Sequence, residues 1–222
     1  CPDISMDALR TTNMNATQYI PRLHNRSVTD GVALYACIAV VMSAVFTTRP
    51  EELTADTWYV TYFGLKTTWE LQQISIITSI FAHANTGHLL TNLLMLAVPV
   101  VVITNQHSPR TTIITGLLTG ITASLIMMIV GDVTGLGGIS IGASTVAYGL
   151  IAAWAQLDDT PVAGRINAKL LLTALIVFSI IRVFYGVPFI GLFRNTATIT
   201  AMSHTAHIAG ALAGYYIFAY TR

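Results

Sequence analysis

Residues 135–157 have the sequence GLGGISIGASTVAYGLIAAWAQL, in which a glycine-rich stretch runs into an apolar one. As a helix, the apolar part from Ser144 to Leu157 would be about 21 Å long, too short to cross the roughly 30 Å hydrocarbon core of a bilayer. The glycines before it favour irregular backbone, which a membrane tolerates only inside protein or beside a wet cavity. We therefore predict a short helix that begins inside the membrane, and its first residues are a candidate site.

The composition of the whole chain is typical of a membrane protein. Apolar residues make up 54% of the 222 residues and charged residues 9%, whereas soluble domains carry about 25% charged residues. Six apolar ranges are predicted to be transmembrane helices: 31–48, 86–105, 111–131, 142–157, 169–187 and 202–220. The fold class is thus all-α, a polytopic six-helix bundle in contact with the lipid bilayer. Residues 1–30 are predicted to form an N-terminal segment and residues 31–222 the membrane domain.

The placement of lysine and arginine predicts a multi-pass protein of the cell membrane with cytoplasmic termini, so residues 1–30 are expected to be cytoplasmic. Of the 11 positive residues, seven fall on the side of the termini and four on the opposite side. The seven are Arg10, Arg22, Arg26, Arg110, Arg165, Lys169 and Arg222; the four are Arg49, Lys66, Arg182 and Arg194. The net charge is +1 and no basic run occurs, so no nucleic acid partner is expected.

Three groups of polar residues lie in or beside the predicted spans, where such residues are costly and indicate function. The groups are His83, His88 and Asn92 at the second span; Gly142, Ser144 and Tyr148 at the start of the fourth; and His207, Gly210 and Gly214 in the last. Residues four apart share one helix face. His88 and Asn92 therefore face the same way, and Gly210 and Gly214 form a pair that lets two helices approach closely.

Together these residues fit nucleophilic catalysis. A serine hydroxyl is a weak nucleophile until a base removes its proton, and histidine is the usual base near neutral pH. The glycine face of the last span would bring His207 against the helix that carries Ser144, with Tyr148 packing beneath the imidazole. Asn92, His88 and the free N–H groups at the start of the fourth span are candidate donors to an oxyanion.

Each group alone also has a structural interpretation. A serine in a membrane helix often bonds its own backbone, and a pair of glycines often serves helix packing only. A buried histidine such as His207 can be structural, and His83 is expected to support the fold rather than to react. The combination of matching parts from three separate spans is what favours catalysis.

In this combination the sequence resembles the rhomboid intramembrane serine proteases over about residues 31–220. That family has a six-helix core with His-x4-His-x3-Asn in the second helix, Gly-x-Ser-x at the start of the fourth and Ala-His-x2-Gly-x3-Gly in the sixth. The matching residues here are His83, His88 and Asn92; Gly142, Ala143, Ser144 and Thr145; and Ala206, His207, Gly210 and Gly214. The chain departs from the family at Ile74-Ser75, where Trp-Arg is frequent, and at Thr145, where glycine is usual.

The resemblance implies a serine endopeptidase that cleaves transmembrane protein substrates with Ser144 as nucleophile and His207 as general base. It also implies an oxyanion hole made by Asn92, His88 and the Ser144 amide. Tyr148 would position His207, and His83 and Gly142 would support the site. The fifth helix and the loop that carries Phe189 and Phe193 would form a gate. We expect no cofactor and no metal.

Two other functions are weighed against this one. A catalytically inactive rhomboid-like protein would bind transmembrane clients without cutting them. Loss of the serine or the histidine would favour it, but Ser144 and His207 are both present. A small transporter or channel predicts paired charges within the spans and an inverted repeat, and the sequence shows neither.

Overall fold

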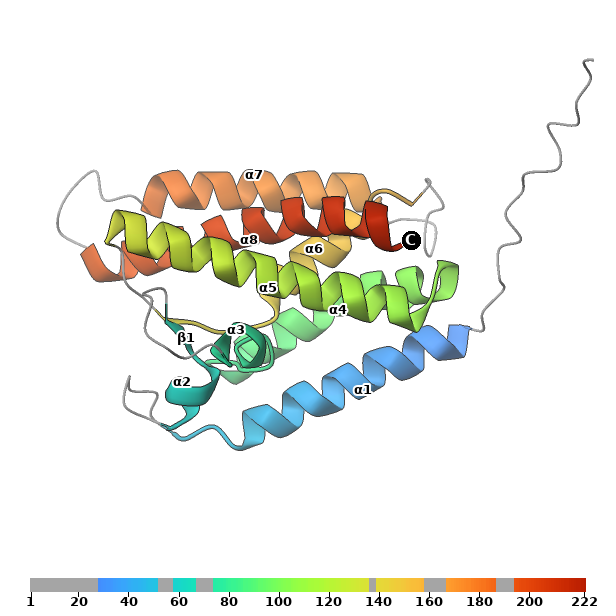
Figure 1. Cartoon of the computed structure of the whole chain (residues 1–222), viewed down its shortest axis with the longest axis horizontal. Coiled ribbons are helices and arrows are strands. Elements are labelled where there is room, and N and C mark those ends of the chain that lie inside the picture. Colours follow the sequence, from blue (N-terminus) through green and yellow to red (C-terminus); the bar gives the residue numbers. More distant parts are fainter. Residues whose placement is uncertain (1–27, 52–57, 67–73, 136–138, 158–166, 187–193) are drawn as a thin grey trace, which may run out of the picture.

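The computed structural model describes residues 28–51, 58–66, 74–135, 139–157, 167–186 and 194–222, with the backbone alone for residues 184–186 and 194–202. In chain order the elements are α1 (Val28–Thr47), α2 (Trp58–Phe63), β1 (Leu65–Lys66), α3 (Ser75–Thr78), α4 (Thr86–Gln106), α5 (Pro109–Thr134), β2 (Ile139–Ser140), α6 (Ser144–Trp154), α7 (Ala168–Gly186) and α8 (Arg194–Thr221) (Figure 1). The predicted helical fold is confirmed. Most of the predicted segment 1–30 lies outside the described residues.

Three helices in the described part of the chain, α1, α4 and α5, are long and apolar enough to cross a membrane. α6 is apolar but has only 11 residues, which is about 17 Å of helix. The expectation of a membrane protein is therefore supported by the helices themselves. The number of six spans, and a fourth span that begins inside the bilayer, stay predictions.

Local sequence explains where the helices that frame the site begin and end. The side-chain oxygen of Asn85 accepts a hydrogen bond from the His88 N–H at 2.8 Å and so caps the start of α4. Gly135 ends α5 in the left-handed region, with φ of 66°, where glycine is favoured. α8 begins at Arg194, whereas the sequence predicted a start at residue 202. The predicted start was late because the threonines of residues 194–201 lower the hydropathy, although they do not break the helix.

α6 is the centre of the packed helices. α8 packs against α5, α6 and α7, and α4 packs against α1 and α6; Figure 1 shows α8 in red between α5 and α7, and α1 in blue at the edge. Every residue of α6 from Val146 to its end is buried. The core beneath it joins Met42 of α1, Ile103 of α4, Leu150 of α6 and Phe218 of α8. A helix enclosed in this way can hold a side chain at its first residue in a fixed place.

The segment just before α6 is fixed from two sides. β1 and β2 pair antiparallel, with Leu65 opposite Ser140. Two residues after this pair, the Gly142 N–H donates a hydrogen bond of 2.8 Å to the Ser79 carbonyl. These bonds satisfy backbone groups that would otherwise be unpaired, and they anchor the chain immediately before Ser144.

Candidate active site

Ser144 and His207 are in hydrogen-bond contact. Ser144 is the first residue of α6, His207 lies in α8, 63 residues later, and the Ser144 Oγ is 2.8 Å from the His207 Nε2. If the hydroxyl donates to Nε2, the ring proton sits on Nδ1. This Nδ1 is buried and has no hydrogen-bond partner in the described part of the chain. The described residues thus offer a serine–histidine pair without a carboxylate behind the ring.

Two glycines of α8 permit this contact. A Cβ added to Gly210 would collide with the backbone of Thr145, and one added to Gly214 would collide with the backbone of Gly149. α8 therefore touches the backbone of α6 along one side, which is the role of small residues between membrane helices. Because His207 lies three residues before Gly210, the same approach holds its ring beside the start of α6.

Tyr148 covers one face of the His207 ring. It lies one turn beyond Ser144 on α6 and is 3% exposed. The two ring centroids are 4.4 Å apart with 12° between the planes, a stacked arrangement. On α8, the His204 ring meets the His207 ring edge to face at 5.2 Å. The imidazole of His207 is thus packed by two rings and hydrogen-bonded to a third side chain.

His88 and Asn92 of α4 converge on Gly142. The backbone of Gly142 has φ of 117°, and a Cβ there would lie 2.7 Å from the His88 Nε2 and 3.1 Å from the Asn92 Nδ2. Asn92 is 1% exposed, and its Nδ2 has no hydrogen-bond partner among the described residues. A buried donor left unpaired is costly, so this amide is available to an oxygen that enters beside Ser144.

His83 packs behind His88 and Asn92, in the loop before α4 and outside the predicted spans. Its backbone N–H donates to the Tyr59 hydroxyl at 3.0 Å, and its Nδ1 is 3.2 Å from the Phe81 carbonyl. Its ring meets the His88 ring edge to face at 5.2 Å. Burial, and then the proximity of His88, lower the pKa of His83 to about 4. The ring is therefore neutral near pH 7 and acts as a packing surface for His88.

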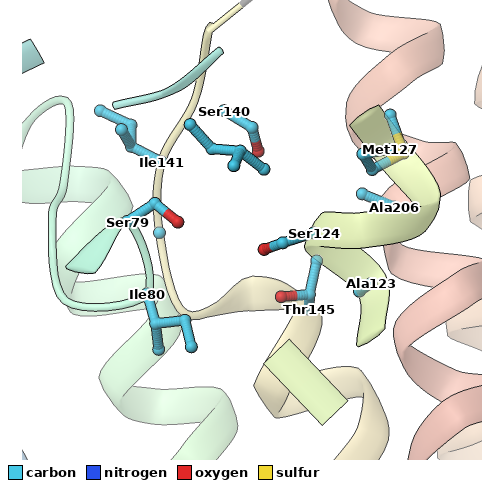
Figure 2. Close-up of a pocket in the computed structure, with 11 residues that line it drawn as sticks. Ser79, Ile80, Ala123, Ser124, Met127, Ser140, Ile141, Thr145 and Ala206 are labelled. Carbon is cyan, nitrogen blue, oxygen red and sulfur yellow. The ribbon is translucent and has the colours of Figure 1, made fainter. Parts of the chain in front are cut away.

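A pocket opens beside the start of α6 (Figure 2). Its cavity volume is about 10 Å³, which is room for about one water molecule. Four hydroxyl-bearing residues line it together with apolar groups: Ser79, Ser124, Ser140 and Thr145. Figure 2 shows the hydroxyls of Ser124 and Thr145 directed into the pocket. Thr145, one of the two departures from the family pattern, therefore forms part of a cavity next to Ser144.

Comparison with known protein families agrees with this arrangement. A family model described as Rhomboid domain matches residues 69–222, more than half of the chain. The chain belongs to the rhomboid family. The resemblance drawn from the three motifs is thereby confirmed, and the matched range of this rhomboid-family chain contains every predicted site residue. Comparison with curated proteins gives no match.

Four residues around the site of this rhomboid-family chain were not singled out from the sequence. Asn85, which caps α4, carries a recognisable signal because asparagine before an apolar helix is a usual cap. Tyr59 and Ser179 carry none, since Tyr59 is one of several rings and hydroxyls in its segment and Ser179 is a single hydroxyl among apolar neighbours. His204 lies outside the three sequence motifs, three residues before His207. Its ring contacts His207 and its Nδ1 is 3.3 Å from the Ser179 Oγ.

The remaining predictions for this rhomboid-family chain concern its loops. Of the Ile74-Ser75 pair, Ile74 is exposed and Ser75, the first residue of α3, is buried. The predicted gate residues Phe189 and Phe193 lie outside the described residues.

Proposed function

We propose that this protein is an intramembrane serine endopeptidase that hydrolyses peptide bonds of transmembrane substrate proteins. Ser144 is the nucleophile and His207 the general base. The observation that supports this most strongly is the 2.8 Å separation of the Ser144 Oγ and the His207 Nε2, which is the reach required of a nucleophile and its base.

The reaction follows the order expected of acyl transfer. The His207 Nε2 accepts the hydroxyl proton while the Ser144 Oγ bonds to the scissile carbonyl carbon, and the carbonyl oxygen becomes an oxyanion. The protonated ring then gives its proton to the leaving amine as the C–N bond breaks. The same ring then takes a proton from a water molecule, whose oxygen bonds to the acyl carbon of the ester, and it gives this proton to the Ser144 Oγ as the acyl–Oγ bond breaks.

The developing oxyanion is the charge that the site has to stabilise. Asn92 supplies an amide, His88 a ring nitrogen and Ser144 its own backbone N–H at the start of α6. This role is supported by where two α4 side chains end. The His88 ring and the Asn92 amide both lie within about 3 Å of the point that a Cβ of residue 142 would occupy, and glycine leaves this point open. Tyr148 positions His207 by stacking, and His83 and Gly142 support the donors.

The pocket beside Thr145 is the proposed binding place for the substrate side chain next to the scissile bond. Its lining includes Gly142, two residues before Ser144, and Thr145, the residue after it. Its hydroxyl lining favours a small side chain that is apolar or itself bears a hydroxyl, because these hydroxyls can bond to one another or to the guest. Because the cavity volume is only about 10 Å³, a long aliphatic side chain would have to push the lining residues apart.

The proposed setting is a six-span bundle in a cell membrane, formed by residues 31–222, with residues 1–30 and both termini in the cytoplasm. α6 begins inside the bilayer, so Ser144 lies below the membrane surface. This is supported by the short length of α6 and by the excess of positive residues on the side of the termini.

The experiment uses the purified full chain in proteoliposomes with a single-span membrane protein that carries a helix-breaking segment. We expect the wild type to release two products, identified by mass spectrometry, and Ser144→Ala to release none. Ser43→Ala, on the peripheral helix α1, is the matched control and should cut as the wild type does. Binding of the substrate by the wild type without any cleavage would instead identify an inactive rhomboid-like protein that holds transmembrane clients.

A further inference from the structure

α7 buries one polar side chain, and this side chain is aimed at the site. Among the described side chains of α7, residues 168–183, Ser179 is the only buried one, with 0% exposure. Its neighbours Phe178 and Ile180 are both partly exposed, although the Phe178 ring also meets the His204 ring edge to face at 5.4 Å. A hydroxyl in an apolar helix needs a partner, and here the hydroxyl reaches side chains of two other helices.

Ser179 bonds both rings that pack on His207. Its Oγ is 3.1 Å from the Tyr148 hydroxyl of α6 and 3.3 Å from the His204 Nδ1 of α8. Tyr148 stacks on one face of the His207 ring, and His204 meets the same ring edge to face. Because a serine hydroxyl has one donor and two acceptor sites, it can satisfy both partners at once. The four side chains form a closed loop with Ser179 and His207 on opposite sides.

We propose that Ser179 is a positioning residue that holds the base His207 in register with Ser144 by fixing both rings that pack on it, Tyr148 and His204. This inference rests on the proposed function. Stacking constrains the distance between two rings but leaves them free to slide and turn. The hydrogen bond to Ser179 fixes the far end of Tyr148, while α6 fixes its Cα, so the ring cannot swing away from the imidazole.

The position of His207 has few other constraints. Its Nδ1 has no hydrogen-bond partner in the part of the chain that is described, so no carboxylate orients the ring from behind. The hydroxyl of Ser144 is the group it must activate and cannot also serve as its anchor throughout the reaction. The two packed rings therefore carry the orientation, and Ser179 ties them to α7.

The test compares Ser179→Ala with Ser179→Thr, which keeps the hydroxyl. A misplacement of about 1 Å can cost on the order of 10²-fold in rate, and we expect roughly a tenfold fall in kcat for Ser179→Ala, with KM unchanged. Ser179→Thr should keep most of the activity. Thr173→Ala removes an exposed hydroxyl of the same helix, bonded to the Lys169 carbonyl at 2.8 Å, and should leave kcat unchanged. All values are normalised to folded protein.

A second readout separates positioning from substrate access. The rate at which a small fluorophosphonate labels Ser144 depends on its activation by His207, and it should fall with kcat in Ser179→Ala. Tyr148→Phe deletes the other end of the same hydrogen bond without touching α7, so it serves if Ser179→Ala does not fold. We expect Tyr148→Phe to show the same fall, and the double variant to be no worse than either single one.

Three results would overturn the inference. One is a normal kcat in folded Ser179→Ala. Another is an equal loss in Ser179→Thr, which would mean packing rather than the hydroxyl matters. The third is a raised kcat with unchanged labelling, which would make Ser179 a latch on α7. A wild type that neither cleaves nor takes the label would instead contradict the proposed function itself.

Discussion

Gly142 offers the sharpest test of how the oxyanion donors are held, through the substitution Gly142→Ala. A Cβ at this position would lie 2.6 Å from the His88 Cε1 and 3.1 Å from the Asn92 Nδ2. Ordinary van der Waals contact of a Cβ begins at 3.4 Å, so the His88 ring has to retreat by nearly 1 Å. The backbone φ of 117° adds strain of about 1–3 kcal/mol, because a residue with a side chain rarely adopts it.

The displacement translates into a loss of rate. Removing one oxyanion donor costs about 10²–10³ in kcat, and a 1 Å misplacement costs about 10². We expect Gly142→Ala to lose about 10²–10³ in kcat with KM little changed, and about 1–3 kcal/mol in the free energy of unfolding. The assay is cleavage of a transmembrane substrate under saturation, beside an unfolding titration of the same preparation.

Gly135→Ala is the matched control. Gly135 has a left-handed φ of 66°, and a Cβ there would meet nothing within 4 Å. It should lose about 1–2 kcal/mol of stability from backbone strain and keep its kcat. The reasoning is refuted if folded Gly142→Ala cleaves at the wild-type rate, or if Gly135→Ala loses the same activity, since strain alone would then account for both.

Three further outcomes follow from the same geometry. Asn92→Ala should lower kcat by about 10²–10³ with KM unchanged; a raised KM at normal kcat would make Asn92 a substrate contact. Gly214→Val should lower thermal stability and kcat together because α8 is pushed off α6, whereas exposed Leu212→Val should change neither; a fully active Gly214→Val would contradict this packing. Burial and then Arg222 lower the pKa of His107, in the connection between α4 and α5. As the pH falls below about 6.5, the unfolded chain therefore binds more protons than the folded chain does. Stability should drop between pH 7.5 and pH 5.5, and less so in His107→Gln; equal drops in both proteins would exclude this residue as a cause.

The parts of the site that share a helix were accessible from the sequence. Helical spacing places His88 and Asn92 on one face, and it places His207 on the same side of its helix as Gly210. The close contact of α6 and α8 was anticipated from the glycine pair, because only small residues allow two backbones to touch. What these patterns cannot supply is a distance, and the contact of Ser144 with His207 became measurable only in the folded chain.

The contributions of α7 were not accessible in this way. Ser179 is the one hydroxyl between Thr173 and Tyr185 in a mainly apolar stretch, and its rotation toward Tyr148 depends on how α7 docks. Hydropathy likewise placed the start of the last helix too late, because threonines before residue 202 reduce apolarity while backbone hydrogen bonds continue to Arg194. Both cases involve tertiary packing, which local periodicity does not encode.

The most direct test of the central claim is a double-mutant cycle on Ser144 and His207. Cleavage of a transmembrane substrate is measured for the wild type, Ser144→Ala, His207→Ala and the double variant, each with its folded fraction. Because nucleophile and base act as one unit, each single variant should fall to background and the double variant should be no lower. Substantial cleavage by either folded single variant, or losses that add in the double variant, would contradict the assignment of the dyad.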